Sequence, residues 1–402
     1  MTQATGQIFA TARAGDARVI AGVSAAHFVS HFYMLVLPPL FAFVREDYGV
    51  SYVELGLALT VFNVVSAVLQ TPAGFLIDRI DARHALVAGL LLGAAGYAVA
   101  AAVDSFWVLV AMFALIGVGN TVYHPADYAI MSHRVSAERM GQAYSIHTFA
   151  GILGSAAAPM SVLLMHSYFG WRGAFFGAAA LGTVVAVLLL MQRDAASVAT
   201  PSAKPNSTAE TDSSWRLLLS RPILVSLVFF MLISAANGGL QNFSVVALGA
   251  LYGTAPLAAN TALTGNLLLS ATGVLIGGWI ASRTLRHRHI AAYGLVTSAV
   301  AVFLIGLIDP NAVLLVALMS LAGFASGVIM PARDLLVRAV TPPGAFGKVF
   351  GFVTNGFNIS GIISPLIFGA LMDHGTPRAV FVLIGVCSLA AILTVFAAVR
   401  KH

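Results

Sequence analysis

The sequence predicts an all-α integral membrane protein whose twelve transmembrane helices form two pseudo-symmetric halves of six helices each. Of its 402 residues, 59% are hydrophobic and only 9% are charged, whereas soluble domains carry about 25% charged residues. Twelve apolar runs are each long enough to cross about 30 Å of hydrocarbon, which takes about 20 helical residues. The alternating pattern of an outer-membrane barrel is missing, so we expect helices that satisfy their own backbone hydrogen bonds.

The expected helices follow one another with short connections. The first is too long for a signal-peptide core and no small-residue cleavage site follows it, so we expect it to be retained. Pro38 and Pro39 should break it near its outer end. The twelve spans cover residues 19–44, 52–77, 85–103, 107–131, 142–166, 173–191, 222–251, 259–282, 290–308, 312–336, 349–372 and 379–399.

One polar stretch interrupts this series. Residues 192–221 are rich in Ala, Ser, Thr and Pro and carry charges of both signs, which is typical of a flexible connector. The chain is therefore expected to comprise a cytoplasmic N-terminal lead at 1–18, a six-helix half at 19–191, a cytoplasmic linker at 192–221, a second six-helix half at 222–399 and a cytoplasmic tail at 400–402.

An internal repeat supports the division into halves. Six residues recur in register 206 positions later, and most of them are glycines and prolines, which fix backbone geometry. Such a register predicts two halves with one architecture and the same orientation, related by an axis along the membrane normal. The pairs are Gly117 and Gly323, Pro125 and Pro331, Gly141 and Gly347, Pro159 and Pro365, Arg172 and Arg378, and Phe175 and Phe381.

The distribution of cations predicts the orientation of the helices. Of the 21 Lys and Arg residues, Arg45, Arg172 and Arg378 fall on one side of the membrane and the other 18 on the side of the N-terminus. The positive-inside rule therefore places both termini in the cytoplasm, in a bacterial-type inner (plasma) membrane. The same residues explain the net charge of +6 through topology and contacts with anionic lipid headgroups, so nucleic acid is not expected as a partner.

Two motifs resemble those of a known family. Residues 74–83 (Gly-x-x-x-Asp-Arg-x-x-x-Arg) resemble the signature that the major facilitator superfamily carries between helices two and three, although Asp81 and Ala82 stand where that pattern has a glycine and a basic residue. Residues 123–127 (Tyr-His-Pro-Ala-Asp) resemble the Phe-His-Pro-Glu stretch of fosmidomycin-resistance-type exporters. The resemblance implies the major facilitator fold and a transporter, not an enzyme.

Polar residues are distributed unevenly among the spans. The spans at 85–103, 173–191, 290–308 and 379–399 contain no His, Asn, Gln, Asp, Glu, Lys or Arg. Because a polar side chain is costly in hydrocarbon, we expect these four helices to face lipid and the other eight to surround a cavity. The residues expected to line the substrate path or couple protons are His27, His31, Asn63, Asn120, His124, Asp127, His147, Asn237, Gln241, Asn242, Asn266, Asn355 and Asn358.

Each of these candidates has a structural alternative. His27 and His31 are spaced i,i+4 and share a helix face, where they could form interhelical hydrogen bonds or line the substrate path. Metal ligation would need further convergent ligands at a known spacing, so no metal is expected, and no cofactor. The Asn and Gln residues could equally serve helix packing or hydrogen-bond a substrate.

A second set of residues is expected to act in conformational switching: Gly74, Asp78, Arg79, Arg83, Arg333 and Asp334. Asp78 lies at the cytoplasmic end of its helix, where an acid can cap a neighbouring helix and pair with a cation. The repeat makes Asp127 equivalent to Arg333. These two could pair across the halves, with Asp334 competing for Arg333, or each could pair within its own half.

These observations favour a secondary active transporter that moves a small organic solute by alternating access. A Walker-type nucleotide-binding loop is missing from the sequence, so ATP is not the direct energy source. Proton coupling is expected, with efflux favoured; the alternatives are an uptake symporter or a uniporter for an organic anion or metabolite, and, less favoured, a membrane receptor, a scaffold or an intramembrane enzyme. The expected partners are the solute, the proton and membrane lipid, with the protein a monomer.

Cysteine labelling tests the orientation. Ser202→Cys and Thr376→Cys, each introduced singly in a Cys387→Ser background, should react from opposite sides, because the linker and Thr376 lie on opposite sides of the expected topology. A membrane-impermeant thiol reagent added to intact cells should label only Thr376→Cys. Labelling of both variants from outside would exclude the twelve-helix topology.

Overall fold

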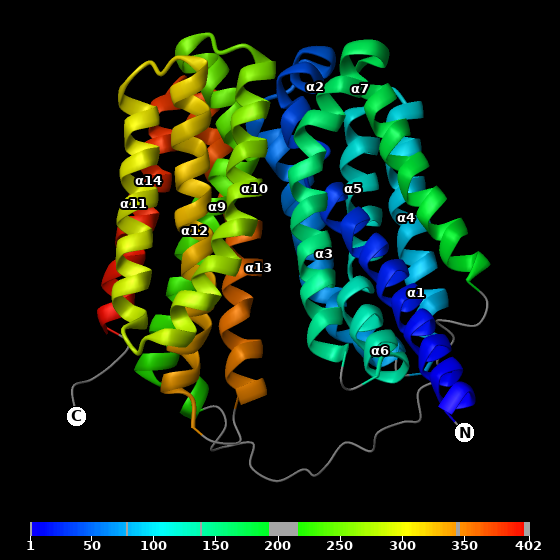
Figure 1. Cartoon of the computed structure of the whole chain (residues 1–402). Helices are drawn as coiled ribbons and strands as arrows, with labels where there is room; N and C mark the ends of the chain where they lie inside the picture. Colours follow the sequence, from blue (N-terminus) through cyan, green and yellow to red (C-terminus); the bar gives the residue numbers. More distant parts are fainter. Residues whose placement is uncertain (1, 78, 137–138, 193–215, 343–345, 398–402) are drawn as a thin grey trace. The chain divides into compact units, whose positions relative to one another are not determined.

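Every regular element in the described part of the chain is helical (Figure 1). The computed structural model describes residues 2–77, 79–136, 139–192, 216–342 and 346–397. In chain order the elements are α1 Thr2–Met34, η1 Pro38–Leu40, α2 Phe41–Tyr48, α3 Tyr52–Ile77, α4 Ala82–Ala102, α5 Phe106–Asn120, α6 Tyr123–Arg134, α7 Met140–Met191, α9 Arg221–Tyr252, α10 Pro256–Arg283, α11 His287–Leu307, α12 Ala312–Val340, α13 Phe346–Asp373 and α14 Pro377–Ala397.

Eleven helical segments among the described residues are long and apolar enough to cross a membrane. The longest, α7, has 52 residues and is interrupted at Gly170, whose backbone is not helical (φ 70°, ψ 177°). Glycine suits this position because a positive φ brings no Cβ clash. The expected spans at 142–166 and 173–191 lie on either side of this break. The all-α, multi-pass membrane fold expected from the sequence is therefore present.

Two other spans are interrupted. The first ends its long helix at Met34 and continues through η1 into α2, as expected from Pro38 and Pro39, which cannot extend a regular helix. The second interruption was not expected: the span at 107–131 consists of α5 and α6, with Thr121 and Val122 between them. Helix α6 begins just before His124, and its first two turns carry His124 and Asp127, whereas Asn120 is the last residue of α5.

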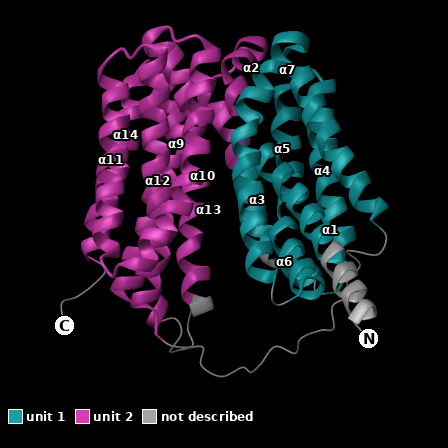
Figure 2. Cartoon of the chain, in the orientation of Figure 1, with its two compact units in different colours: residues 1–37, 61–204 teal, residues 38–60, 205–402 magenta. Residues whose placement is uncertain are grey.

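The chain forms two compact units (Figure 2). Unit 1 comprises residues 1–37 and 61–204, and unit 2 comprises 38–60 and 205–402. Helix α3 belongs to both, since its first nine residues, 52–60, group with unit 2. There Asp373 accepts hydrogen bonds from the backbone N–H groups of Tyr52 (2.7 Å) and Val53 (2.8 Å), which satisfies two free donors at the start of α3. The domain boundaries at 19–191 and 222–399 follow the sequence repeat and stay a prediction.

Each unit has its own apolar core. In unit 1, α1 packs on α7, and α4 packs on α5 and α7; the fully buried ring of Tyr97 contacts Tyr33, Phe113 and Phe175. In unit 2, α10 packs on α12, and α9 packs on α13 and α14, around fully buried rings such as those of Phe230 and Phe368.

Equivalent glycines make equivalent helix contacts in the two units. A Cβ on Gly117 would lie 2.8 Å from the carbonyl oxygen of Phe62, and a Cβ on Gly323 would overlap the carbonyl oxygen of Asn266. Phe62 and Asn266 are 204 positions apart, two fewer than Gly117 and Gly323. Close backbone approach at small residues is the usual packing mode of membrane helices, and here it is repeated.

A glycine substitution tests the importance of this packing. Gly154 on α7 lies so close to the carbonyl oxygen of Phe28 on α1 that a Cβ would overlap it, whereas Gly141 on the same helix has no neighbouring atom within 4 Å. Gly154→Ala should lower the free energy of unfolding by about 1–3 kcal/mol through overpacking. Gly141→Ala should leave it unchanged or raise it slightly, because alanine favours helix. Thermal unfolding in detergent measures both, and equal stability of the two variants would contradict the predicted close contact.

Candidate functional site

Five of the predicted polar residues come together inside unit 1. His27 and His31 lie on α1, His124 and Asp127 on α6, and His147 on α7. The i,i+4 spacing on α1 and the i,i+3 spacing on α6 each direct two side chains to one helix face. These two faces and His147 of α7 meet, and we call the five residues the histidine cluster.

Asp127 is the central residue of this cluster. Its side chain has no exposed surface, and Nε2 of His147 lies 2.9 Å from its Oδ2 atom. Nδ1 of His27 lies 3.6 Å from the same oxygen, too far for a hydrogen bond. Oδ1 of Asp127 and Nδ1 of His27 are both buried without a hydrogen-bond partner among the described residues. The carboxyl group therefore depends on His147 for its one hydrogen bond.

The histidine rings are in mutual contact. The ring of His27 stacks on that of His147, with centroids 3.8 Å apart, and has the rings of His31 and His124 at 4.6 and 5.1 Å. Gly151 on α7 makes room for this arrangement, since a Cβ there would lie 2.5 Å from Nε2 of His27. The cluster thus offers several closely spaced sites for a proton on three different helices.

The cluster also contains a set of possible metal ligands. One ligand atom each from His27, Asp127 and His147 lies within 4.8 Å of the other two. Two imidazoles and a carboxylate suit Zn²⁺ chemically, but the set is one ligand short of a closed structural site. The sequence contains no recognisable metal-binding spacing because these ligands come from three separate helices.

The other predicted residues of unit 1 lie outside the cluster. Asn120 donates a hydrogen bond from Nδ2 to Oγ of Ser66 (3.4 Å), and Ser66 donates to the carbonyl oxygen of Gly117 (3.2 Å). Asn120 therefore joins α5 to α3. Asn63 is half-buried on α3.

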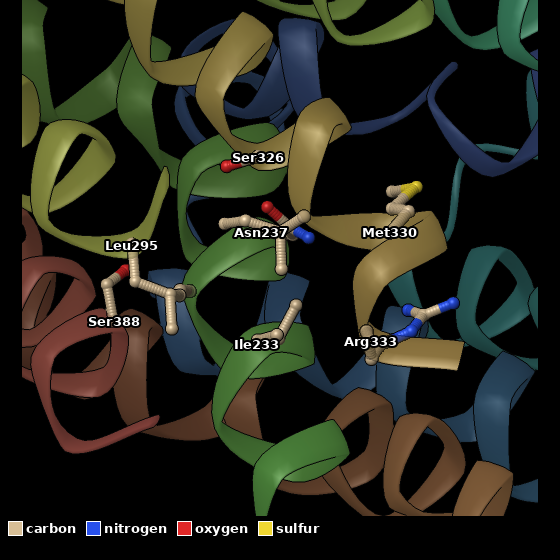
Figure 3. A pocket seen from close by; sticks show the side chains of 9 residues that line it. Ile233, Asn237, Leu295, Ser326, Met330, Arg333 and Ser388 are labelled. Atoms are coloured by element: carbon tan, nitrogen blue, oxygen red, sulfur yellow. The ribbon is translucent and has the colours of Figure 1, made fainter. Parts of the chain in front are cut away.

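Unit 2 contains a small pocket that includes two of the predicted residues (Figure 3). Asn237 from α9 and Arg333 from α12 both line it. The guanidinium of Arg333 lies over the rings of Phe230 and Phe357, 4.5 and 5.3 Å from their centroids. Nε of Arg333 donates a hydrogen bond to Oδ1 of Asp334 (2.9 Å). The two phenylalanine faces were not anticipated, because stacking on a cation leaves no pattern in the sequence.

The remaining predicted residues of unit 2 are dispersed. Asn266 is buried and donates to the carbonyl oxygen of Met319 (2.9 Å), which joins α10 to α12. Asn358 donates to Asn355 along α13 (3.5 Å). Gln241 and Asn242 are half-buried on α9.

Asp127 and Arg333 each have a partner within their own unit. Asp127 is bound by His147, and Arg333 is bound by the adjacent Asp334. Pairing of Asp127 with Arg333 across the halves stays a prediction.

The loop motif at 74–83 has a clear structural role at its C-terminal end. Arg83 is buried and donates from Nε to the carbonyl oxygen of Leu189 (2.9 Å) and from Nη2 to that of Leu190 (2.5 Å). These carbonyls belong to the last turn of α7, where a cation also complements the helix dipole. Asp81 accepts hydrogen bonds from two N–H groups in the first turn of α4, so the residue that departs from the signature is a helix cap. Asp78 lies outside the described residues.

Comparisons with known proteins agree with these features. A family model described as Major Facilitator Superfamily matches residues 23–249 and 227–402. The chain is 24% identical over 394 residues to the Fosmidomycin resistance protein of Escherichia coli (strain K12), covering 96% of this chain and 93% of that protein. It is 25% identical over 349 residues to the Probable nitrate/nitrite transporter NarK2 of Mycobacterium tuberculosis (strain ATCC 25618 / H37Rv), covering 84% and 85%. Its fold is similar to the crystal structure of a bacterial homologue of the human lysosomal transporter Spinster, with a TM-score of 0.79, 13% identity and coverage of 95% and 97%.

Removal of the Arg83 hydrogen bonds tests the role of the motif. Arg83→Gln should lower the free energy of unfolding by about 1.5–3 kcal/mol, the usual contribution of hydrogen bonds from a charged group. Arg79→Gln is the matched control, since Arg79 is exposed, and should change stability by less than about 0.5 kcal/mol. Thermal unfolding of the purified variants gives the comparison. Equal effects of the two substitutions would show that the α7 contacts do not stabilise unit 1.

Proposed function

Because the chain belongs to the major facilitator superfamily and is a multi-pass secondary transporter, not an enzyme, we propose that it moves a small organic solute by proton-coupled alternating access. We favour export as the direction of transport. The observation that carries the coupling proposal is the fully buried Asp127, bonded to His147 and adjacent to His27. When a single proton binds or leaves, the charge of such a carboxyl group changes, and so does the free-energy cost of keeping it buried.

The chemistry of the cluster supports proton transfer. With one proton shared between Asp127 and His147, the pair has no net charge; removal of this proton leaves an uncompensated negative charge inside the unit. An uncompensated buried charge costs about 3–5 kcal/mol, so release of the proton requires water or a rearrangement of α1, α6 and α7. The other titratable side chains around the group are His31 and Tyr33 on α1, Tyr97 on α4, His124, Tyr123 and Tyr128 on α6, and Tyr144 on α7.

The direction of transport is the least constrained element of the proposal. One relative is named for resistance to fosmidomycin and another for transport of nitrate and nitrite, and neither name states a direction of transport. We favour export on the likeness of residues 123–127 to the exporter stretch. The second candidate function is uptake symport or uniport of an organic anion or metabolite. The cationic Arg333 in the pocket of unit 2 supports an anionic solute, whichever the direction of transport.

We further propose an inner-membrane location with both termini in the cytoplasm and a monomeric transporter that contacts anionic lipid. The support is the distribution of cations, with 18 of 21 Lys and Arg residues on the side of the N-terminus.

An Asp127 variant tests proton coupling. A solute that raises the thermal stability of the purified wild type serves as the transport probe, since a substrate stabilises the state it binds. Asp127→Asn in liposomes should lose accumulation driven by a pH gradient by about tenfold or more, because the amide cannot carry the proton, while solute counterflow without a gradient continues.

Asp104→Asn is the matched control, because Asp104 lies outside the cluster and pairs with Arg172 (2.6 Å); its gradient-driven accumulation should match the wild type. Full accumulation in Asp127→Asn would contradict the proposed role. A flat pH profile between about pH 5 and 8 in a His27→Gln, His31→Gln double variant would then assign coupling to the histidines.

A further inference from the structure

We propose that Arg333 and Asn237 form a subsite for an oxyanion group of the transported solute, such as a carboxylate, phosphonate or sulfonate. This inference rests on the proposed transport function and adds the chemical class of the solute. Such a subsite needs a cation with unused hydrogen-bond donors, a second donor in the same pocket and apolar walls for the rest of the solute.

Arg333 is a largely buried cation within a membrane-spanning helix. It lies within α12, which ends at Val340, and only 12% of its side chain is exposed. A guanidinium has five N–H donors, and within the described part of the chain only Nε is used, in the bond to Asp334. The four N–H groups on Nη1 and Nη2 have no protein acceptor there. Charged groups inside membrane helices are rare and usually mark substrate or ion pathways.

The two phenylalanines contact Arg333 without accepting a conventional hydrogen bond from it. Its Cζ atom lies over the rings of Phe230 and Phe357, 4.5 and 5.3 Å from their centroids. This contact is a cation–π attraction, whereas a carboxylate or phosphonate binds a guanidinium through two parallel N–H···O bonds. The two rings therefore hold the group without an oxygen acceptor of the kind that an oxyanion supplies.

The second donor is the side-chain amide of Asn237. It lines the same pocket as Arg333 (Figure 3), and no described residue forms a hydrogen bond with it. The serine hydroxyls of the pocket are already engaged: Oγ of Ser326 lies 3.3 Å from Oγ of Ser298, and Ser388 donates to the carbonyl oxygen of Ile384 (3.0 Å). Arg333 and Asn237 thus both carry side-chain N–H donors for which no described residue supplies an acceptor.

The rest of the pocket is apolar. Its other lining side chains are Ile233, Ala236, Leu295, Ile329 and Met330. Sites for organic ligands combine apolar walls of this kind with a few placed polar groups.

A purely structural ion pair does not account for this arrangement. Asp334 is 46% exposed and adjacent to Arg333 in sequence, and exposed pairs of this kind contribute little stability. Asp334 also has the sign of the proposed solute group. It therefore competes with an incoming oxyanion, so that its removal should strengthen anion binding.

Binding measurements on the purified full-length protein test the subsite. The probe is a panel of small carboxylates, phosphonates and sulfonates, each paired with its uncharged amide or ester, screened by thermal shift and then by calorimetry. The compounds that stabilise the wild type should be the anions. Arg333→Gln should weaken their binding by about 10- to 100-fold, the loss expected for hydrogen bonds to a charged group, and Arg333→Lys should weaken it less, because lysine keeps the charge without the bidentate geometry.

Two further variants separate recognition from stability. Asp334→Asn should bind the same anions more tightly than the wild type, an effect that a structural role of the ion pair would not produce and that is measurable even if Arg333→Gln fails to fold. Arg338→Gln, at the end of the same helix, is the control and should bind as the wild type does.

Several outcomes would overturn the subsite. In the first, only uncharged or cationic compounds stabilise the wild type. In the second, no oxyanion of the panel binds. In the third, Asp334→Asn binds the anions as weakly as the wild type or more weakly. Failure of the transport proposal has a different signature: anion binding would depend on Arg333 while liposomes showed no proton-driven accumulation. Proton-driven transport of a neutral solute, unaffected by Arg333→Gln, would contradict the subsite alone.

Discussion

The cost of a charge inside hydrocarbon governs the organisation of this protein. The repeat places Asp127 and Arg333 at equivalent positions 206 residues apart, and each unit accommodates its charge with neighbours of its own. Unit 1 encloses Asp127 completely and supplies a hydrogen bond from His147. Unit 2 covers Arg333 with two phenylalanine faces and gives it a single carboxylate partner. One architecture thus contains a fully buried carboxyl group in one copy and a partly satisfied cation in the other.

Glycine packing positions these charges. Gly151 leaves the space on α7 that the ring of His27 occupies, so the backbone separation of α1 and α7 is set where the cluster forms. The same device recurs across the repeat. A Cβ on Gly89 would lie 2.9 Å from the carbonyl oxygen of Gly119, and a Cβ on Gly294 would lie 3.0 Å from that of Ala325, at offsets of 205 and 206. Since close-packed interiors do not deform continuously, we expect a change in the hydrogen bonding of Asp127 to move α1, α6 and α7 as whole segments.

The sequence predicted the helical membrane fold well because hydrophobic length and cation distribution are local properties. It did not predict the break between α5 and α6, since Thr121 and Val122 carry no glycine or proline signal. For the site, the i,i+4 spacing predicted a shared face for His27 and His31. The hydrogen bonding of each asparagine depends on its tertiary neighbours. Asn266 donates to the carbonyl oxygen of Met319, whereas no described residue accepts from the side chain of Asn237. Nothing in the sequence around these two residues distinguishes them.

The opposite charges of the two proposed sites bear on the direction of transport. If an anion leaves the cell while a proton enters, two positive charges in effect move inward in each cycle. The membrane potential then contributes about 2.3 kcal/mol per charge per 100 mV, twice over, in addition to the pH gradient. If an anion and a proton enter together, their charges cancel and only the pH gradient and the solute gradient remain. An oxyanion solute therefore makes proton-coupled export the energetically stronger cycle, and the two directions differ in whether transport carries current.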